Sequence, residues 1–125
     1  MNKFGMVMVV GAVLFTGLGV LAHEEHGQTG EQELTGEVVD VFCYLSHGEE
    51  GLGKKHAACA KKCIKGGLPV AIKVGDQLYL ASMADHTSAN QNLADLAAEQ
   101  VTVRGKVMER DGQHLVAITS IEKTR

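Results

Sequence analysis

Apolar and polar side chains alternate along several short stretches from residue 34 onward, and this alternation predicts β-strands. Five such stretches are separated by turn-forming residues: 34–43, 70–74, 77–81, 101–109 and 115–121. The pairs Gly75-Asp76 and Asp111-Gly112 each stand between two of these strands. Such pairs are typical of two-residue hairpin turns. The pattern therefore predicts two β-hairpins that follow a first, separate strand.

Two further stretches have helical rather than alternating character. Residues 54–65 (KKHAACAKKCIK) are rich in Ala and Lys and are followed by Gly66-Gly67, which is typical of a helix that ends at a glycine. Residues 88–99 place their leucines at helical spacing. Between the first strand and the first helix, residues 46–53 contain three glycines and are expected to form a loop.

This order of elements predicts a mainly β protein, a small five-stranded OB-fold-like barrel. The domain is expected to span residues 34–125. One helix, inserted after the first strand at about 43–67, carries Cys and His residues, and a second helix lies between the third and fourth strands. A ferredoxin-like sandwich is the alternative, but it has only four strands and needs a crossover helix after the first.

The N-terminal segment has the pattern of an export signal. Residues 1–22 contain one charge, Lys3, followed by an apolar run that ends in small residues, so we expect a signal peptide cleaved after Ala22. The protein would then be periplasmic or secreted. An uncleaved membrane anchor is the alternative, since the run is just long enough to span a bilayer. Residues 23–33 are almost entirely polar and are expected to be a disordered leader.

Composition argues against nucleic-acid binding. Cleavage would leave 103 of the 125 residues and, by removing Lys3, would change the net charge from −3 to −4. A chain without basic excess does not attract phosphates in general. The residues after 22 also include only three aromatic side chains, too few for a base-stacking surface.

Candidate chemistry is concentrated between residues 43 and 63, where all three cysteines lie. His56, Cys59 and Cys63 are spaced by three and four residues, which places them within about 60° of one another on a helix. Cys43, at the end of the first strand, can approach that face. Three thiolates and an imidazole form a Cys₃His set suited to Zn²⁺ or Cu⁺.

The distance between His56 and Cys63 is the weakest point of the predicted Cys₃His set. Seven residues separate it from Cys63, or about 10.5 Å along a regular helix, so His56 must sit in an unwound first turn or outside the direct ligands. His47 is the substitute, and His23 and His26 are possible additional ligands. Asp40 can orient a ligand imidazole, cap the insertion or face water.

The same cysteines also permit a redox interpretation. Exported proteins meet an oxidising environment, and Cys43 paired with Cys59 or Cys63 would staple the insertion and leave one thiol free. The lysines around the helical cysteines are expected to lower thiol pKa values. A thiol–disulfide protein and a disulfide-stapled ligand- or protein-binding barrel therefore remain alternatives to a metal-binding protein.

Three short patterns carry a resemblance to known proteins: Gly36-x-Val38-x-Asp40-x-x-Cys43-Tyr44, His56-x-x-Cys59-Ala60-x-x-Cys63 and Gly67-x-Pro69-Val70. They resemble those of a group of small exported bacterial OB-fold-like proteins. The resemblance implies export and a shared Cys/His site, and it implies no particular activity. Since no catalytic motif emerges, we expect a non-enzymatic exported metal-binding protein. Its expected partners are a metal ion and another exported protein. Nucleic acid is not an expected partner, and a membrane is one only if the signal segment is retained.

Overall fold

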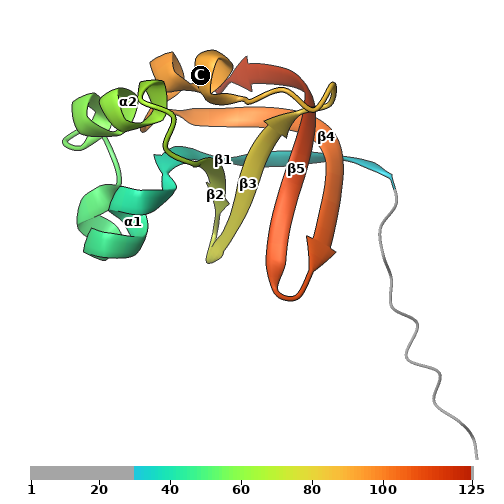
Figure 1. Ribbon diagram of the computed structural model, residues 1–125, viewed down its shortest axis with the longest axis horizontal. Coiled ribbons are helices and arrows are strands. Elements are labelled where there is room, and N and C mark those ends of the chain that lie inside the picture. Colours follow the sequence, from blue (N-terminus) through green and yellow to red (C-terminus); the bar gives the residue numbers. More distant parts are fainter. Residues whose placement is uncertain (1–29, 125) are drawn as a thin grey trace, which may run out of the picture.

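Five strands form a closed barrel in the computed structural model, which describes residues 30–124 (Figure 1). The strand order around the barrel is β1-β2-β3-β5-β4. Neighbouring strands are antiparallel except β3 and β5, which run parallel where the sheet closes. The strands are β1 (Glu31–Asp40), β2 (Val70–Val74), β3 (Gln77–Met83), β4 (Gln100–Arg110) and β5 (Gln113–Lys123). The predicted five-stranded OB-fold-like barrel is confirmed.

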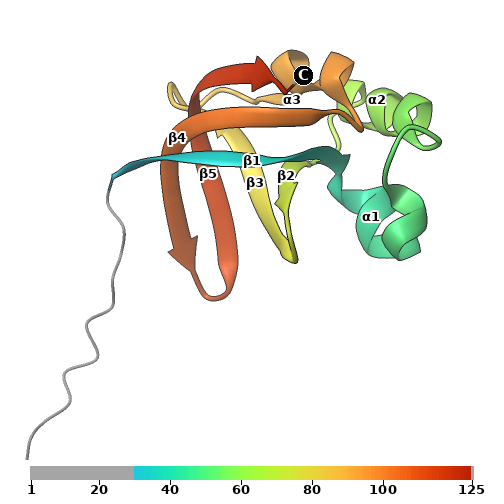
Figure 2. The ribbon, with the colours of Figure 1, turned by 180° about the vertical axis from the view of Figure 1, so that it is seen from behind.

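The helices gather toward one end of the barrel (Figure 2). Those inserted between β1 and β2 are α1 (Val41–His47), the 3₁₀ turn η1 (Gly48–Gly51) and α2 (Ala57–Lys65). Those between β3 and β4 are α3 (Asn90–Leu93) and the 3₁₀ turn η2 (Ala94–Leu96). Both predicted helices are thus present, although the second consists of two short turns. Within residues 30–124, no helix combines the length and apolar character needed to cross a membrane.

The first strand differs from its predicted bounds at both ends. It begins at Glu31, so residues 31–33, predicted to belong to the disordered leader, instead pair with Arg104–Lys106 of β4. It ends at Asp40 rather than at Cys43. There the side chain of Asp40 accepts a hydrogen bond from the backbone nitrogen of Phe42, and the chain turns into α1. The signal segment and most of the leader lie outside the described residues.

Helix α2 begins at Ala57, three residues later than predicted, and its glycine stop is confirmed. Gly67 has a φ of 95°, a left-handed conformation that glycine adopts without strain. The backbone nitrogen of Leu68 donates to the carbonyl oxygen of Cys63, which closes the last turn. The end of the helix that carries two cysteines is therefore well defined.

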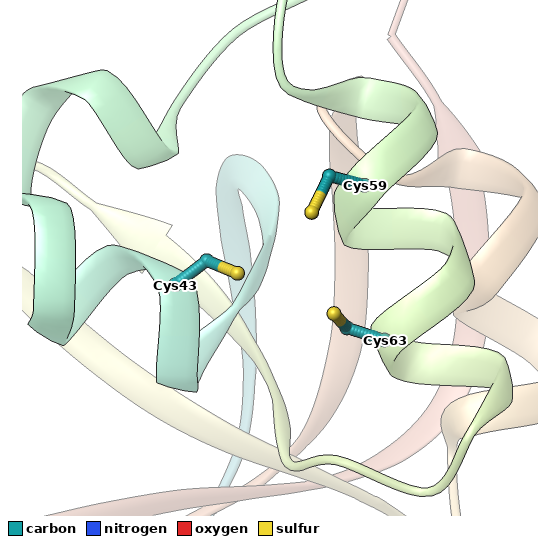
Figure 3. Close-up of side chains that lie close together, drawn as sticks. All are labelled: Cys43, Cys59 and Cys63. Carbon is teal, nitrogen blue, oxygen red and sulfur yellow. The ribbon is translucent and has the colours of Figure 1, made fainter.

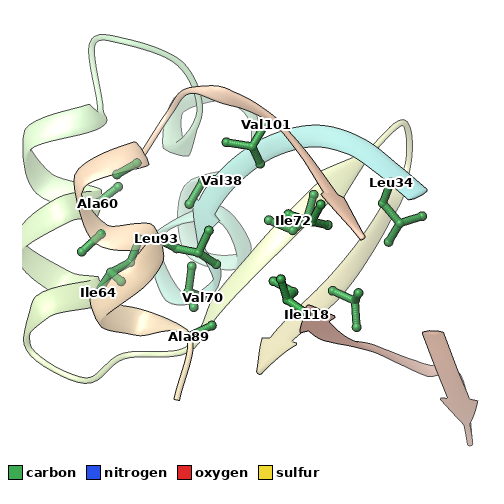
Figure 4. Packing of buried hydrophobic residues seen from close by; sticks show 14 residues of the cluster. Leu34, Val38, Ala60, Ile64, Val70, Ile72, Ala89, Leu93, Val101 and Ile118 are labelled. Atoms are coloured by element: carbon green, nitrogen blue, oxygen red, sulfur yellow. The ribbon is translucent and has the colours of Figure 1, made fainter. Parts of the chain in front are cut away.

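The core fills the barrel and extends to the inner face of α2 (Figure 4). Inside the barrel, Val38, Ile72 and Ile118 are fully buried. Ile64 of α2 is 0 % exposed, and burying such a side chain stabilises the fold by about 1.5–3 kcal/mol. Helix α2 is consequently fixed on the barrel through apolar contacts that do not involve its cysteines.

Candidate metal centre

The three cysteines approach one another across the gap between two helices (Figure 3). Cys43 lies on α1, and Cys59 and Cys63 lie on α2. Their sulfur atoms are all within 4.8 Å of one another, and all three are free thiols. Cys43 is buried, Cys63 is half-buried and Cys59 is exposed. The described residues thus bring together three thiols that could hold a metal ion.

Helical periodicity accounts for the part of the site on α2. Cys59 and Cys63 are four residues apart and therefore lie one above the other on the same side of the helix. Ala60 and Ile64, each one residue further along, are buried in the core. Because Ala60 and Ile64 face the core, Cys59 and Cys63 face α1.

Cys43 is positioned by a close approach between α1 and the turn that follows it. A Cβ atom at Gly51 would lie 2.9 Å from the carbonyl oxygen of Cys43, closer than side chains tolerate, so the approach requires glycine. The backbone nitrogen of Gly53 donates to a carboxylate oxygen of Glu37 at 2.6 Å. These contacts hold the loop against β1 and α1, and they present the thiol of Cys43 to α2.

A second group of potential ligands consists of Asp40, Cys43 and His56, whose ligand atoms also lie within 4.8 Å of one another. The predicted Cys₃His set therefore divides into two groups that share Cys43. His56 is the N-cap residue of α2, with helical φ and ψ angles of −95° and −9°, and its carbonyl oxygen accepts a hydrogen bond from the backbone nitrogen of Ala60 at 3.0 Å. The predicted unwound first turn is therefore not observed at His56. Its imidazole is grouped with Asp40 and not with the two cysteines of α2.

Asp40 is buried beside the cysteines, and the sequence left its role open. It is 0 % exposed and caps α1, so of the roles considered for it the cap is the one observed and the solvent-facing position is wrong. Its Oδ2 atom is buried and has no hydrogen-bond partner among residues 30–124. The same holds for Nε2 of His56 within this part of the chain. Buried polar atoms without partners are rare in proteins, and both of these residues belong to the ligand group that contains Cys43.

The electrostatics of the thiols differ from the prediction. The carboxylate of Asp40, together with burial, raises the pKa of the Cys43 thiol well above its ordinary range. Burial, followed by Asp40, likewise raises the pKa of Cys63. Two of the lysines expected to lower these pKa values, Lys61 and Lys65, instead form ion pairs with Asp95. Without a cation, the two less exposed thiols therefore keep their protons.

The remaining candidates lie elsewhere or outside the described residues. His47 is exposed in the last turn of α1 and belongs to neither ligand group. His23 and His26 precede the described residues. A disulfide between Cys43 and Cys59 or Cys63 stays a prediction, since the three sulfur atoms lie within 4.8 Å of one another and none is bonded to another.

The chemistry that these residues support is coordination of a metal ion by sulfur, nitrogen and oxygen atoms from β1, α1, α2 and the residue that caps α2. What the chain does must be inferred from this arrangement. No protein-family model, curated protein or solved structure matches the chain significantly.

Proposed function

We propose that this chain is an exported, non-enzymatic protein that binds zinc or copper through Cys43, Cys59 and Cys63, with His56 next to them. One observation carries the proposal: three sulfur atoms from two separate helices lie within 4.8 Å of one another. Thiols that serve only packing have no reason to converge in this way. Metal ligands must converge, because each bond to the ion is only about 2.0–2.3 Å long.

The type of ligand narrows the choice of metal. Thiolates select soft or borderline ions, so Zn²⁺ and Cu⁺ fit the site, whereas Mg²⁺ and Ca²⁺ prefer oxygen ligands. An imidazole nearby suits both of the favoured ions. We therefore infer a site for Zn²⁺ or Cu⁺.

The burial of the ligands favours carriage of the metal over a purely structural role. Cys59 is exposed, so a partner protein or a small thiol can reach the bound ion. The barrel has a continuous apolar core that includes the inner face of α2 and does not depend on the cysteines. A metal whose loss leaves the barrel folded can be delivered and released, unlike the metal of a zinc finger.

Export is the second part of the proposal and is supported by the sequence alone. The charge-poor apolar segment 1–22 and the resemblance to small exported bacterial proteins both favour it. The N-terminal sequence of protein recovered from the periplasm tests this part. A new N-terminus at His23 is expected, and full-length protein confined to the cytoplasm would contradict export.

A thiol–disulfide protein is the second candidate function. It is favoured by the exposure of Cys59 next to the buried Cys43, an arrangement that a substrate disulfide can approach. This function predicts a mixed disulfide at Cys59 when the other two cysteines are replaced.

One experiment separates the two functions. Protein purified from its own compartment is analysed for metal content, and its free thiols are counted after denaturation with a chelator. Metal binding predicts at least one ion per chain and three free thiols. Cys59→Ser should lower the metal content, whereas Ala58→Ser, a neighbouring exposed position of α2, should not. A disulfide with no metal would overturn the proposal and favour the second candidate.

A further inference from the structure

Cys43 belongs to both groups of potential ligands, and the remaining members of the two groups differ. We propose that the site holds two divalent metal ions, with the Cys43 thiolate as the bridge between them. Cys59 and Cys63 complete the ligands of the first ion, and Asp40 and His56 complete those of the second. This inference rests on the proposed metal-binding function and specifies its stoichiometry.

Independent support for the second ion comes from the two atoms without partners. Asp40 uses Oδ1 to cap α1, which leaves Oδ2 free although the residue is 0 % exposed. Nε2 of His56 is also buried without a partner in the described part of the chain. The ligand atoms of Asp40 and His56 lie within 4.8 Å of each other, yet the two side chains form neither a hydrogen bond nor an ion pair with each other. A metal ion between them would satisfy both atoms at once.

The charges of the ligands point to the same number of ions. Three thiolates and one carboxylate carry four negative charges when all are deprotonated. One divalent ion would leave two of these charges uncompensated, whereas two divalent ions neutralise the set. Cys43 and Asp40 are both buried, and an uncompensated charge in such a place is strongly unfavourable. Complete occupation by two ions is therefore the electrostatically balanced state.

The two halves of the site differ in chemistry and access. The first ion would be held by sulfur alone and lies beside the exposed Cys59, from which it can be exchanged. The second would have sulfur, nitrogen and oxygen ligands, a mixture that suits Zn²⁺, and two of these three ligands are buried. We expect the first ion to be the more readily removed of the two.

The test is a titration of reduced, metal-free protein with Zn²⁺ and, separately, with Cd²⁺ as a spectroscopic probe. Native mass spectrometry counts the ions, and ultraviolet absorption reports the bonds from sulfur to cadmium. The wild-type protein should bind two ions of either metal. His56→Ala and Asp40→Asn should each bind one and retain the sulfur-to-cadmium absorption. Asparagine still offers an oxygen to cap α1, so Asp40→Asn should keep the helix.

Matched controls and the contrary outcomes make the result decisive. His47→Ala removes an exposed imidazole from the neighbouring helix and should still bind two ions, and circular dichroism verifies the fold of each variant. One ion in the wild type, unchanged in His56→Ala, would refute the second ion and leave the proposed function intact. Loss of all metal in His56→Ala would show that a single ion uses both groups. No metal in the reduced wild type would refute both proposals.

Discussion

The side-chain amide of Asn90 donates a hydrogen bond to the carbonyl oxygen of Ile64, with 2.7 Å between the two atoms. The same nitrogen donates to the carbonyl oxygen of Leu68 at 2.8 Å. Asn90 is the first residue of α3, whereas Ile64 lies in the last turn of α2 and Leu68 lies in the segment that follows this helix. A single side chain thus connects the helix that carries Cys59 and Cys63 to the segment that precedes β4.

We predict that Asn90→Ala lowers the free energy of unfolding by about 1–2 kcal/mol, because it removes two hydrogen bonds to backbone carbonyl groups. The carbonyl of Ile64 keeps a second donor, the backbone nitrogen of Gly67. Urea denaturation of the metal-free, reduced protein measures the change. Asn92→Ala is the matched control, since Asn92 is exposed on the same short helix, and it should be nearly neutral. Equal stability of the two variants would show that the contact contributes nothing.

We predict that Gly51→Ala weakens metal binding without removing a ligand. The added methyl group meets the backbone of Cys43 and Tyr44 at 2.9 Å, so η1 and α1 must move apart and displace the Cys43 thiol. A loss of metal affinity of about 10–100-fold is expected, as for other changes that disturb the support of a metal ligand. Competition with a chromophoric chelator measures it. Glu50→Ala, an exposed neighbour, should keep the wild-type affinity.

We predict that the metal-free protein becomes less stable as the pH rises above about 8.5, the ordinary pKa of a cysteine. The folded state raises the pKa of Cys43 and of Cys63. The unfolded chain therefore releases these protons at a lower pH than the folded chain, and alkaline conditions favour unfolding. Denaturation midpoints between pH 7 and 10, under reducing conditions, should fall. Cys43→Ala should flatten this dependence, and a wild-type midpoint that rises with pH would contradict the assignment.

The pH dependence of metal binding should have the opposite direction. A metal ion binds the thiolate and must displace the protons that Cys43 and Cys63 retain. The apparent affinity for Zn²⁺ should therefore increase between pH 6 and pH 8, with release of protons that calorimetry in buffers of different ionisation enthalpy can count. Binding that is independent of pH would mean that the two thiols are not ligands.

We predict that Ile64→Ala destabilises the metal-free protein by about 2–5 kcal/mol, the usual range for a fully buried isoleucine. The side chain joins α2 to the barrel core. Lys62→Ala, on the exposed part of the same helix, serves as the control. Saturating Zn²⁺ should recover part of the loss, because an ion bound between α1 and α2 stabilises the folded state by mass action.

The sequence was sufficient to predict the barrel and the convergence of the cysteines. Alternation identified all five strands, and the four-residue spacing of Cys59 and Cys63 correctly placed both on one side of a helix. These features depend on periodicity and on local turn residues, which a single sequence displays directly. The grouping of Cys43 with this helix followed from its position after the first strand.

Helix α1 could not be predicted in the same way. Val41, Phe42 and Cys43 continue the apolar pattern of the strand and have β propensity. Tertiary contacts override that preference, because Asp40 caps the backbone of Phe42 and the nitrogen of Val41 donates to the carbonyl oxygen of Pro69. The grouping of His56 with Asp40 depends on the turn at Asp40 from β1 into α1. Periodicity could not predict this grouping for the same reason.

The parallel pairing of β3 with β5 has a consequence for incomplete chains. Every residue of both ligand groups precedes β2, whereas the barrel closes only when the last strand enters between β3 and β4. A chain that ends before Gln113 would possess all of these ligands and two unpaired strand edges. Such edges are templates for aggregation. Synthesis or proteolysis that stops short of β5 would therefore yield material able to capture metal but prone to form insoluble assemblies.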